Sequence, residues 1–542
     1  WLFYATDFLT HTHIGTGTVC DRMLDHFTLA GDPHPVTRAR YDWQVYDPAR
    51  KEKGGVRWHT VEGPFVLRRK NLYYQMFSGG NWQNLTYGVS YAVSDRVARE
   101  DEWEQAADGA RVLPILRTIP EKVIGPGHNS VVRAPDNRQL FCVYHRWDGE
   151  RGRVLAIDRL DWVGERMTVL GATTTPQAAP LAPTLKGFSS EREGDLGEGW
   201  TCEGDGLWRV RAGEARQEAA TAVAASAHCE ADGSSFVLEV SLRALGEPDA
   251  ASAFGVALAK DGERALQFTI EPGANEARLN WLATDGARAE TRFALPTDFE
   301  PRALHLLRAE IDGRHATIFL DERVVRWQGT LNAAPDRVAL VTEGGAAAFK
   351  GFELTTGWEE LFMQPERSLG ERGWQQAGEA WQLRDNLLRF DDAEGRDHRI
   401  ITRALPLESY ELVVNVRLER ERSRGEGCYG ICPASGAKDF APLLTVEREG
   451  KGDNWRLVAR NLETDALETG SIVESWPLPA SFDPFVMQQF RFRKQHGRLS
   501  IGWEATPLGD TNITTEATGV GLYAHRAAVV FDMVRVTKIR ES

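Results

Sequence analysis

Apolar residues along the chain fall in short runs separated by clusters of glycine, asparagine and aspartate. The runs over residues 72–77, 139–144 and 315–320 are rich in aromatic and β-branched side chains. Runs of this length and composition, bounded by turn-forming residues, predict β-strands. Because long stretches with apolar residues every three or four positions are scarce, few helices are expected. We therefore predict an all-β protein.

Residues 173–183 (Thr-Thr-Thr-Pro-Gln-Ala-Ala-Pro-Leu-Ala-Pro) interrupt this pattern. Proline lacks the backbone N–H that a sheet ladder needs, and it favours an extended backbone. The stretch therefore predicts a domain boundary. We place a linker at residues 173–186, after an N-terminal domain of residues 1–172.

The rest of the chain contains an internal repeat. A Gly-Trp pair followed by a further tryptophan occurs twice, as Gly199-Trp200 with Trp208 and as Gly373-Trp374 with Trp381. A similar pattern of apolar residues surrounds residues 340–349 and residues 522–531. Such self-similarity predicts two copies of one domain, and many short strands with turn signals favour a β-sandwich for each copy. The copies are predicted at residues 187–355 and 357–540.

Both copies resemble concanavalin-like jelly rolls, and the second opens like the sandwich domains found beside bacterial carbohydrate enzymes. This resemblance implies accessory domains. Their tryptophans have two interpretations, packing in the core or stacking on sugar rings.

Composition narrows the class of partner. The chain of 542 residues has a formal net charge of −14 at pH 7. This charge disfavours binding to nucleic acid, since such surfaces concentrate lysine and arginine. No apolar run approaches the ~20 residues that cross a bilayer, so we expect no membrane-spanning segment. Neutral or weakly charged ligands fit this composition better.

The six cysteines lack the spacing of a metal site. Two interpretations stay open: buried thiols, or a disulfide between Cys202 and Cys229 that would indicate an oxidising compartment. The chain opens with Trp1 in a strand-like apolar run, without the charged start of a signal peptide. We expect further sequence upstream.

Three features of the first 170 or so residues carry candidate chemistry. The first is Thr-Val-Glu-Gly-Pro-Phe-Val at residues 60–66, in which Glu62 stands directly before Gly-Pro. A carboxylate at such a turn is held in a defined direction, because proline restricts φ and glycine allows close approach. The second is Gly-Pro-Gly-His-Asn-Ser-Val-Val at residues 125–132, which contains His128. The third is Gly152-Arg153, which leads into the run at residues 157–162.

Together these features resemble the fourth and fifth blades of glycoside hydrolase family 43, a five-bladed β-propeller that cleaves arabinose- or xylose-containing glycans. Their order and the blade-sized spacing of 66 residues from Glu62 to His128 make the joint match specific. The resemblance implies inverting, exo-acting hydrolysis of terminal arabinofuranosyl or xylosyl residues, with galactofuranosides also within reach. Glu62 matches the general acid of the family.

The resemblance also implies two aspartates, a general base on the first blade and a residue of the third blade that tunes the acid. Neither has a match in this chain. Asp7 lies after its strand rather than before it, and Asp483 lies in the second sandwich repeat. We expect residues 1–172 to hold about the last three blades, and a second chain or upstream sequence to supply the others.

Four further residues receive roles from the resemblance. His128 either coordinates calcium in the propeller channel, largely through water, or is a hydrogen-bonded structural histidine. Arg153 matches an arginine at the floor of the active site, where its guanidinium suits sugar hydroxyls or a carboxylate, with an exposed surface arginine as the alternative. Trp43 and Trp82 are expected on loops that line the sugar subsite, with ordinary packing as the alternative. No organic cofactor is expected.

A second hypothesis belongs to another functional class. The chain would be a non-catalytic carbohydrate-binding protein, in which an incomplete propeller and two sandwiches hold glycan without cleaving it. The unmatched aspartates favour this alternative, whereas Glu62 favours the enzyme.

Overall fold

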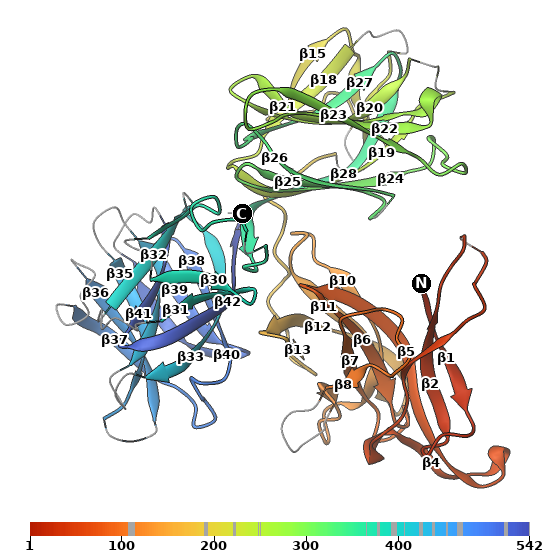
Figure 1. Cartoon of the computed structure of the whole chain (residues 1–542), viewed down its shortest axis with the longest axis vertical. Coiled ribbons are helices and arrows are strands. Elements are labelled where there is room, and N and C mark those ends of the chain that lie inside the picture. The colour runs from red at the N-terminus through yellow and green to blue at the C-terminus, as the bar shows by residue number, and fades with distance from the viewer. Residues whose placement is uncertain are drawn as a thin grey trace. The chain divides into compact units, whose positions relative to one another are not determined.

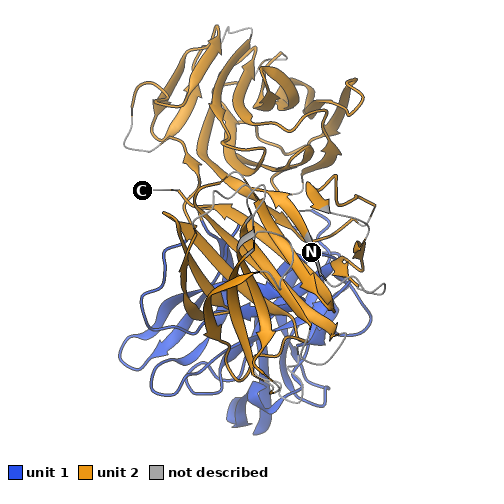
Figure 2. Cartoon of the chain, turned by 90° about the vertical axis from the view of Figure 1, so that its left-hand side faces the viewer, with its two compact units in different colours: residues 1–134, 138–180 blue, residues 135–137, 181–542 orange. Residues whose placement is uncertain are grey.

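The computed structural model describes residues 1–25, 27–106, 114–188, 193–219, 224–247, 249, 251–322, 324–364, 366–376, 380–391, 398–405, 407–421, 427–435, 440–450, 452, 454–462, 470–513 and 519–540. Over these residues the elements are β-strands and three short 3-10 helices, which confirms the all-β prediction. The chain divides into two compact units, residues 1–134 with 138–180 and residues 135–137 with 181–542 (Figure 2).

The first unit begins with a nine-stranded sheet whose main path is β1-β2-β5-β6-β7-β8. Its strands are β1 (Leu2–Phe8), β2 (Gly15–Asp21), β3 (His34–Thr37), β4 (Val45–Arg50), β5 (Val56–Arg69), β6 (Leu72–Gly79), β7 (Gly88–Ser94), β8 (Glu104–Gln105) and β9 (Leu116–Arg117). Two 3-10 helices, η1 (Asp42–Gln44) and η2 (Lys51–Lys53), flank β4. Strands β2 and β5 pair in parallel, while the other pairs are antiparallel.

A four-stranded antiparallel sheet completes the first unit, and its strands follow one another in chain order. They are β10 (Ile124–Arg133), β11 (Leu140–Asp148), β12 (Gly152–Val163) and β13 (Arg166–Val169) (Figure 1). One apolar core joins the two sheets: Tyr74 and Met76 of β6 share a cluster with Tyr144 of β11 and Trp162 of β12. This packing brings β5, β6 and β10 together.

The second unit contains two layered bodies, each with its own apolar core. In the first body a seven-stranded sheet runs β15-β18-β27-β20-β21-β22-β23, and the facing sheet contains β26-β25-β24-β19-β28 with β14, β16 and β17 at its side. The bounds are β14 (Leu185–Lys186), β15 (Thr201–Gly204), β16 (Trp208–Arg211), β17 (Glu214–Gln217), β18 (Ala224–Glu230), β19 (Ser235–Ala244), β20 (Ala253–Lys260), β21 (Glu263–Glu271), η3 (Pro272–Ala274), β22 (Glu276–Leu282), β23 (Arg288–Ala294), β24 (His305–Asp312), β25 (His315–Leu320), β26 (Val325–Thr330), β27 (Arg337–Glu343) and β28 (Ala347–Glu360).

The second body repeats the two-layer plan. One sheet runs β29-β32-β41-β34-β35-β36-β37, and the facing strands are β42-β33-β38-β39-β40 with β30 and β31. The bounds are β29 (Trp374–Gln376), β30 (Trp381–Arg384), β31 (Leu387–Phe390), β32 (His398–Ala404), β33 (Tyr410–Glu421), β34 (Cys428–Ser435), β35 (Phe440–Arg448), β36 (Trp455–Leu462), β37 (Ser471–Pro477), β38 (Gln488–Gln495), β39 (Arg498–Trp503), β40 (Thr506–Asn512), β41 (Gly519–His525) and β42 (Ala527–Lys538).

Strand β28 belongs to both bodies. Its first part pairs with β19, and its last four residues, from Gly357 to Glu360, pair with β42. The facing strands of the two bodies therefore form one continuous 15-stranded sheet. Within the stretch predicted as a linker, Leu185 already pairs with Leu354 of β28. A shared strand leaves little freedom between the two bodies, because its backbone hydrogen bonds run through the junction.

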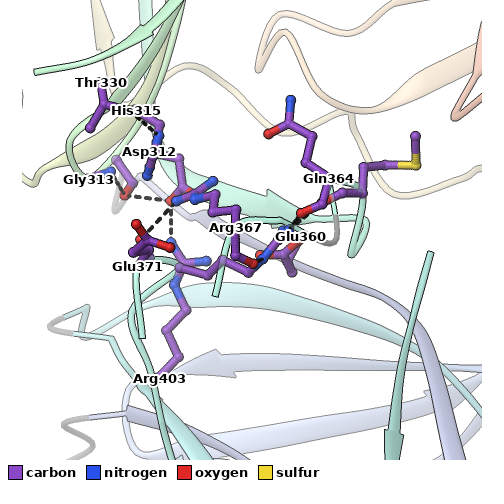
Figure 3. Close-up of polar contacts among 12 residues, drawn as sticks. Asp312, Gly313, His315, Thr330, Glu360, Gln364, Arg367, Glu371 and Arg403 are labelled. Carbon is purple, nitrogen blue, oxygen red and sulfur yellow. Dashed lines mark hydrogen bonds and ion pairs between the residues drawn. The ribbon is translucent and has the colours of Figure 1, made fainter. Parts of the chain in front are cut away.

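A largely buried ionic cluster reinforces the junction between these two bodies (Figure 3). Asp312, at the end of β24, forms ion pairs with Arg367 (3.4 Å) and with Arg403 of β32. The guanidinium of Arg403 also lies over the buried ring of Trp358, 3.9 Å from its centroid. Burial alone would raise the pKa of Asp312, but the two positive charges outweigh it and hold that pKa below its usual value.

Three of the four tryptophans of the repeat, Trp208, Trp374 and Trp381, are buried in the cores, and Trp200 packs partly buried against the core of the first body. All six cysteines are free thiols, so the proposed Cys202–Cys229 disulfide is not formed. Cys202 is exposed, which also departs from the expectation of a buried thiol. In the part of the chain that the structure describes, no helix has the length and apolar character to cross a membrane.

Replacing Asp312 with asparagine should destabilise the second unit by about 3 kcal/mol, because two largely buried guanidinium groups lose their counter-charge. Urea unfolding followed by tryptophan fluorescence measures this change. Asp385→Asn is the matched control, since Asp385 is exposed and its ion pairs with Arg384 and Arg389 are 3.5 Å long. The control should cost less than about 0.5 kcal/mol. Equal losses for the two variants would show that the cluster does not hold the junction.

Candidate active site

Glu62 lies in the middle of β5, where the ladder to β6 is irregular. The residue pairs with Ser78, and the register then shifts before Phe65. Gly63, at φ +60°, adopts the left-handed conformation that this break requires. A bulge of this kind re-aims the side chain beside it. The carboxylate of Glu62 is consequently part-exposed, with 31 % of its side chain accessible.

Tyr87 holds this carboxylate in place. Its hydroxyl donates a hydrogen bond of 2.8 Å to Oε1 of Glu62. The tyrosine stands directly before β7 and is 1 % exposed. Burial raises its pKa well above the ordinary value, and the negative charge of Glu62 and the hydrogen bond to it raise it further. The phenol therefore remains a hydrogen-bond donor at any physiological pH.

His128 approaches Glu62 from β10. Its Nδ1 lies 4.0 Å from Oε1 of Glu62, and about half of its side chain is exposed. The backbone N–H of His128 donates to Oγ of Ser78 at 2.6 Å, so the residue that pairs with Glu62 also anchors His128. A Cβ on Gly63 would lie 3.4 Å from the ring of His128. Three strands thus meet at Glu62.

Trp82, Trp147 and Arg153 form a second group nearby. The guanidinium carbon of Arg153 lies 4.2 Å from the ring centroid of Trp82, a cation–π contact. The ring of Trp147 packs edge-on against Trp82 at 5.1 Å, and Trp147 pairs with Arg153 across β11 and β12. The exposed cation therefore stands over an aromatic surface.

His145 of β11 joins the two groups. Its ring stacks on Tyr87 at 5.7 Å between centroids and an angle of 25°. Burial, together with the positive charge of Arg153 and the neighbouring His128, lowers the pKa of His145 to about 4. A neutral imidazole against the phenol completes the support behind Glu62.

Trp43 and Asp7, two further residues considered from the sequence, contact other groups. Trp43 belongs to η1, where its ring stacks on Phe77 at 6.3 Å and contacts Gly79. Its place beside the core favours the packing alternative, and its role in sugar binding stays a prediction. Asp7 of β1 forms an ion pair of 3.0 Å with Lys53.

The described residues do not form a set of ligands for calcium. They contain no group of three or more histidine, cysteine, aspartate or glutamate side chains that could hold a metal ion. His128 offers nitrogen, whereas Ca²⁺ takes six to eight oxygen ligands. The calcium site stays a prediction from the resemblance.

The sequence did not single out Tyr87 or Trp147, and it assigned no role to His145. The sequence contains one indication of where the ring of Tyr87 lies, namely Gly127 in the Gly-Pro-Gly-His motif. A Cβ on Gly127 would lie 2.2 Å from Cε1 of Tyr87, so glycine makes room for the ring. The contact joins residues 40 positions apart, which no local pattern reveals.

Comparisons with known proteins find similarity in the part of the chain that contains Glu62, His128 and Arg153. The model of the family "Glycosyl hydrolases family 43" matches residues 36–166. The beta-D-galactofuranosidase xynD of Aspergillus niger is 38 % identical over 104 residues, which are 18 % of this chain and 28 % of that protein. The chain thus spans less than a third of this curated relative.

Solved structures show weaker similarity. A thermostable family-43 glycoside hydrolase is 29 % identical, with a TM-score of 0.27 over 33 % of this chain and 55 % of that one. Carbohydrate binding module CBM66 from Bacillus subtilis is 16 % identical, with a TM-score of 0.25 over 30 % of this chain and 93 % of that one. At scores this low, neither similarity determines the fold of the whole chain.

The lowered pKa of His145 has a measurable consequence. The folded chain binds this proton at about pH 4, whereas the ordinary value is 6.5. The unfolded chain therefore takes up the proton first as the pH falls, and stability that is complete above about pH 6.5 is lost towards pH 4. NMR of the imidazole should show His145 neutral at about pH 5. Urea unfolding should show a shallower loss of stability with acid in His145→Asn, but not in the control His496→Asn, whose side chain is exposed. Titration of His145 near 6.5 would contradict this expectation.

Proposed function

We propose that this chain, whose residues 36–166 match the family 43 glycosyl hydrolases, is a glycoside hydrolase with Glu62 as its proton donor. One observation carries the proposal. Within the matched region, a part-exposed carboxylate is held by the buried hydroxyl of Tyr87 and stands beside His128. A general acid needs this combination of a fixed direction and access to substrate.

The reaction that follows is acid-assisted hydrolysis. Glu62 donates its proton to the glycosidic oxygen while the bond from that oxygen to the anomeric carbon breaks. In an inverting enzyme a second carboxylate, roughly 6.5–9.5 Å from the acid, removes a proton from the attacking water. We assign this base to no residue of the chain, and a second chain as its source stays a prediction.

Trp82 and Arg153 are the proposed sugar contacts. An indole face packs against the C–H surface of a sugar ring, and a guanidinium donates hydrogen bonds to hydroxyl groups. Because Arg153 lies over Trp82, loss of the indole also releases the cation from its position. The two residues therefore act as one binding surface.

Terminal arabinofuranosyl, xylosyl and galactofuranosyl residues are the proposed substrates. The name of the Aspergillus niger relative supports the inclusion of galactofuranosides. The two layered bodies of residues 187–355 and 357–540 are proposed as accessory domains.

Replacing Glu62 with glutamine tests the proposal. On an arabinofuranosyl or xylosyl oligosaccharide, kcat should fall about 10²- to 10⁴-fold, because the leaving alkoxide must be protonated. On the 4-nitrophenyl glycoside of the same sugar the loss should be much smaller, since nitrophenolate leaves without a proton. Initial rates on 4-nitrophenyl arabinofuranoside, xyloside and galactofuranoside identify the sugar first.

Glu165→Gln is the control for this experiment, because Glu165 is exposed in the turn between β12 and β13. Equal rates for wild type and Glu62→Gln on the oligosaccharide would remove Glu62 from the mechanism. Glycan binding without hydrolysis in the wild type would instead support the carbohydrate-binding alternative.

Trp82→Ala should raise KM several-fold with a smaller change in kcat, since it removes a stacking contact of about 1 kcal/mol and loosens Arg153. Michaelis–Menten analysis of the best glycoside measures both values. Trp82→Phe keeps an aromatic face beneath Arg153 and should recover most of the affinity. An unchanged KM in the alanine variant would exclude Trp82 from the sugar site.

A further inference from the structure

The two oxygens of Glu62 have different surroundings. Oε1 accepts the hydroxyl proton of Tyr87 at 2.8 Å, and the same oxygen lies 4.0 Å from Nδ1 of His128. A protonated carboxyl group has one O–H, and an oxygen that accepts a donor hydrogen bond serves better as the carbonyl oxygen. The hydrogen bond of Tyr87 therefore distinguishes the two oxygens.

Tyr87 itself has almost no freedom to move. The side chain is 1 % exposed, and one face of its ring stacks on His145. The ring passes so close to Gly127 that a Cβ there would lie 2.2 Å from Cε1. Strands β10 and β11 thus hold the donor, while β5 holds the acceptor.

We propose that Tyr87 is a positioning residue that acts through Glu62: its hydroxyl occupies Oε1, so that the transferable proton resides on Oε2 and faces the substrate. This inference rests on the proposed function. When the proton passes from Oε2 to the glycosidic oxygen, Glu62 becomes a carboxylate and Tyr87 keeps its own proton. The hydrogen bond then becomes charge-assisted and stronger, which stabilises the transition state more than the ground state.

The other polar groups around Tyr87 and Glu62 are compatible with the positioning role of Tyr87. Arg153 of β12 carries a fixed positive charge, and its influence on Tyr87 is smaller than that of burial. His145 of β11 is neutral above about pH 5 because its pKa is about 4. Ser78 of β6 lies beside Tyr87, and His128 of β10 is the titratable group that faces Glu62 directly.

Tyr87→Phe removes the donor and keeps the ring. On the oligosaccharide substrate, kcat should fall roughly tenfold to a hundredfold, the range of a lost hydrogen bond to a charged group, with KM nearly unchanged. The alkaline limb of the pH profile of kcat should move to higher pH, because the ionised carboxylate loses the donor that favours it. A residue that merely supports the fold would not move this limb.

Two further variants separate positioning from stability. Tyr74→Phe also removes a buried hydroxyl, one that donates to the backbone oxygen of Glu165, and should leave both kcat and the alkaline limb unchanged. Gly127→Ala displaces the ring of Tyr87 and should reproduce the loss of kcat. Thermal unfolding of each variant shows that it is folded at the assay temperature.

A carboxyl ¹³C NMR titration of the full chain tests the hydrogen bond without turnover. The signal that disappears in Glu62→Gln should titrate at higher pH in Tyr87→Phe than in wild type. Wild-type activity that needs Glu62 but is unaffected by Tyr87→Phe would overturn the inference and leave the proposed function standing. If wild type hydrolyses no glycoside even in the presence of the chain predicted to supply the base, the proposed function fails, and an unmoved carboxyl titration then overturns the positioning role as well.

Discussion

The candidate site depends on the close approach of strands at two glycines. Gly127 leaves space for the ring of Tyr87, and Gly63 turns β5 so that Glu62 leaves the regular ladder. A side chain at position 127 would occupy the space of the Tyr87 ring, so the hydroxyl of Tyr87 could not reach the carboxylate of Glu62. The carboxylate would then no longer be held at the point where Ser78 and His128 also meet it. A steric constraint on the backbone thus decides where the acidic group points.

A different interaction organises the second unit. Strand β28 runs from one layered body into the other, and Asp312 of the first body holds two arginines, Arg367 and Arg403. Backbone hydrogen bonds in a shared sheet and a buried ion pair both depend strongly on geometry. The two bodies, which are proposed as accessory domains, are therefore mechanically coupled. They also have a similar arrangement of strands.

The strand pattern predicted the fold class well, because side-chain alternation and turn residues are local properties. The run at 315–320 coincides with β25, and the run at 72–77 lies within β6 (Leu72–Gly79). Cys202 shows the limit of such reasoning. Burial is a property of the environment, and the paired strand β15 leaves this residue exposed although cysteine is usually buried.

The sequence by itself determined the residue types, their order and the motif around Glu62, and through the family resemblance these predicted the general-acid role that is proposed for Glu62. Only the tertiary structure decided which groups act on that acid. Tyr87, His145 and Gly127 come from separate strands, so their convergence depends on sheet packing and not on sequence spacing. The same packing places Trp43 of η1 beside the core and Trp82 beneath Arg153. The residues next to each tryptophan in the sequence carry no signal for either environment.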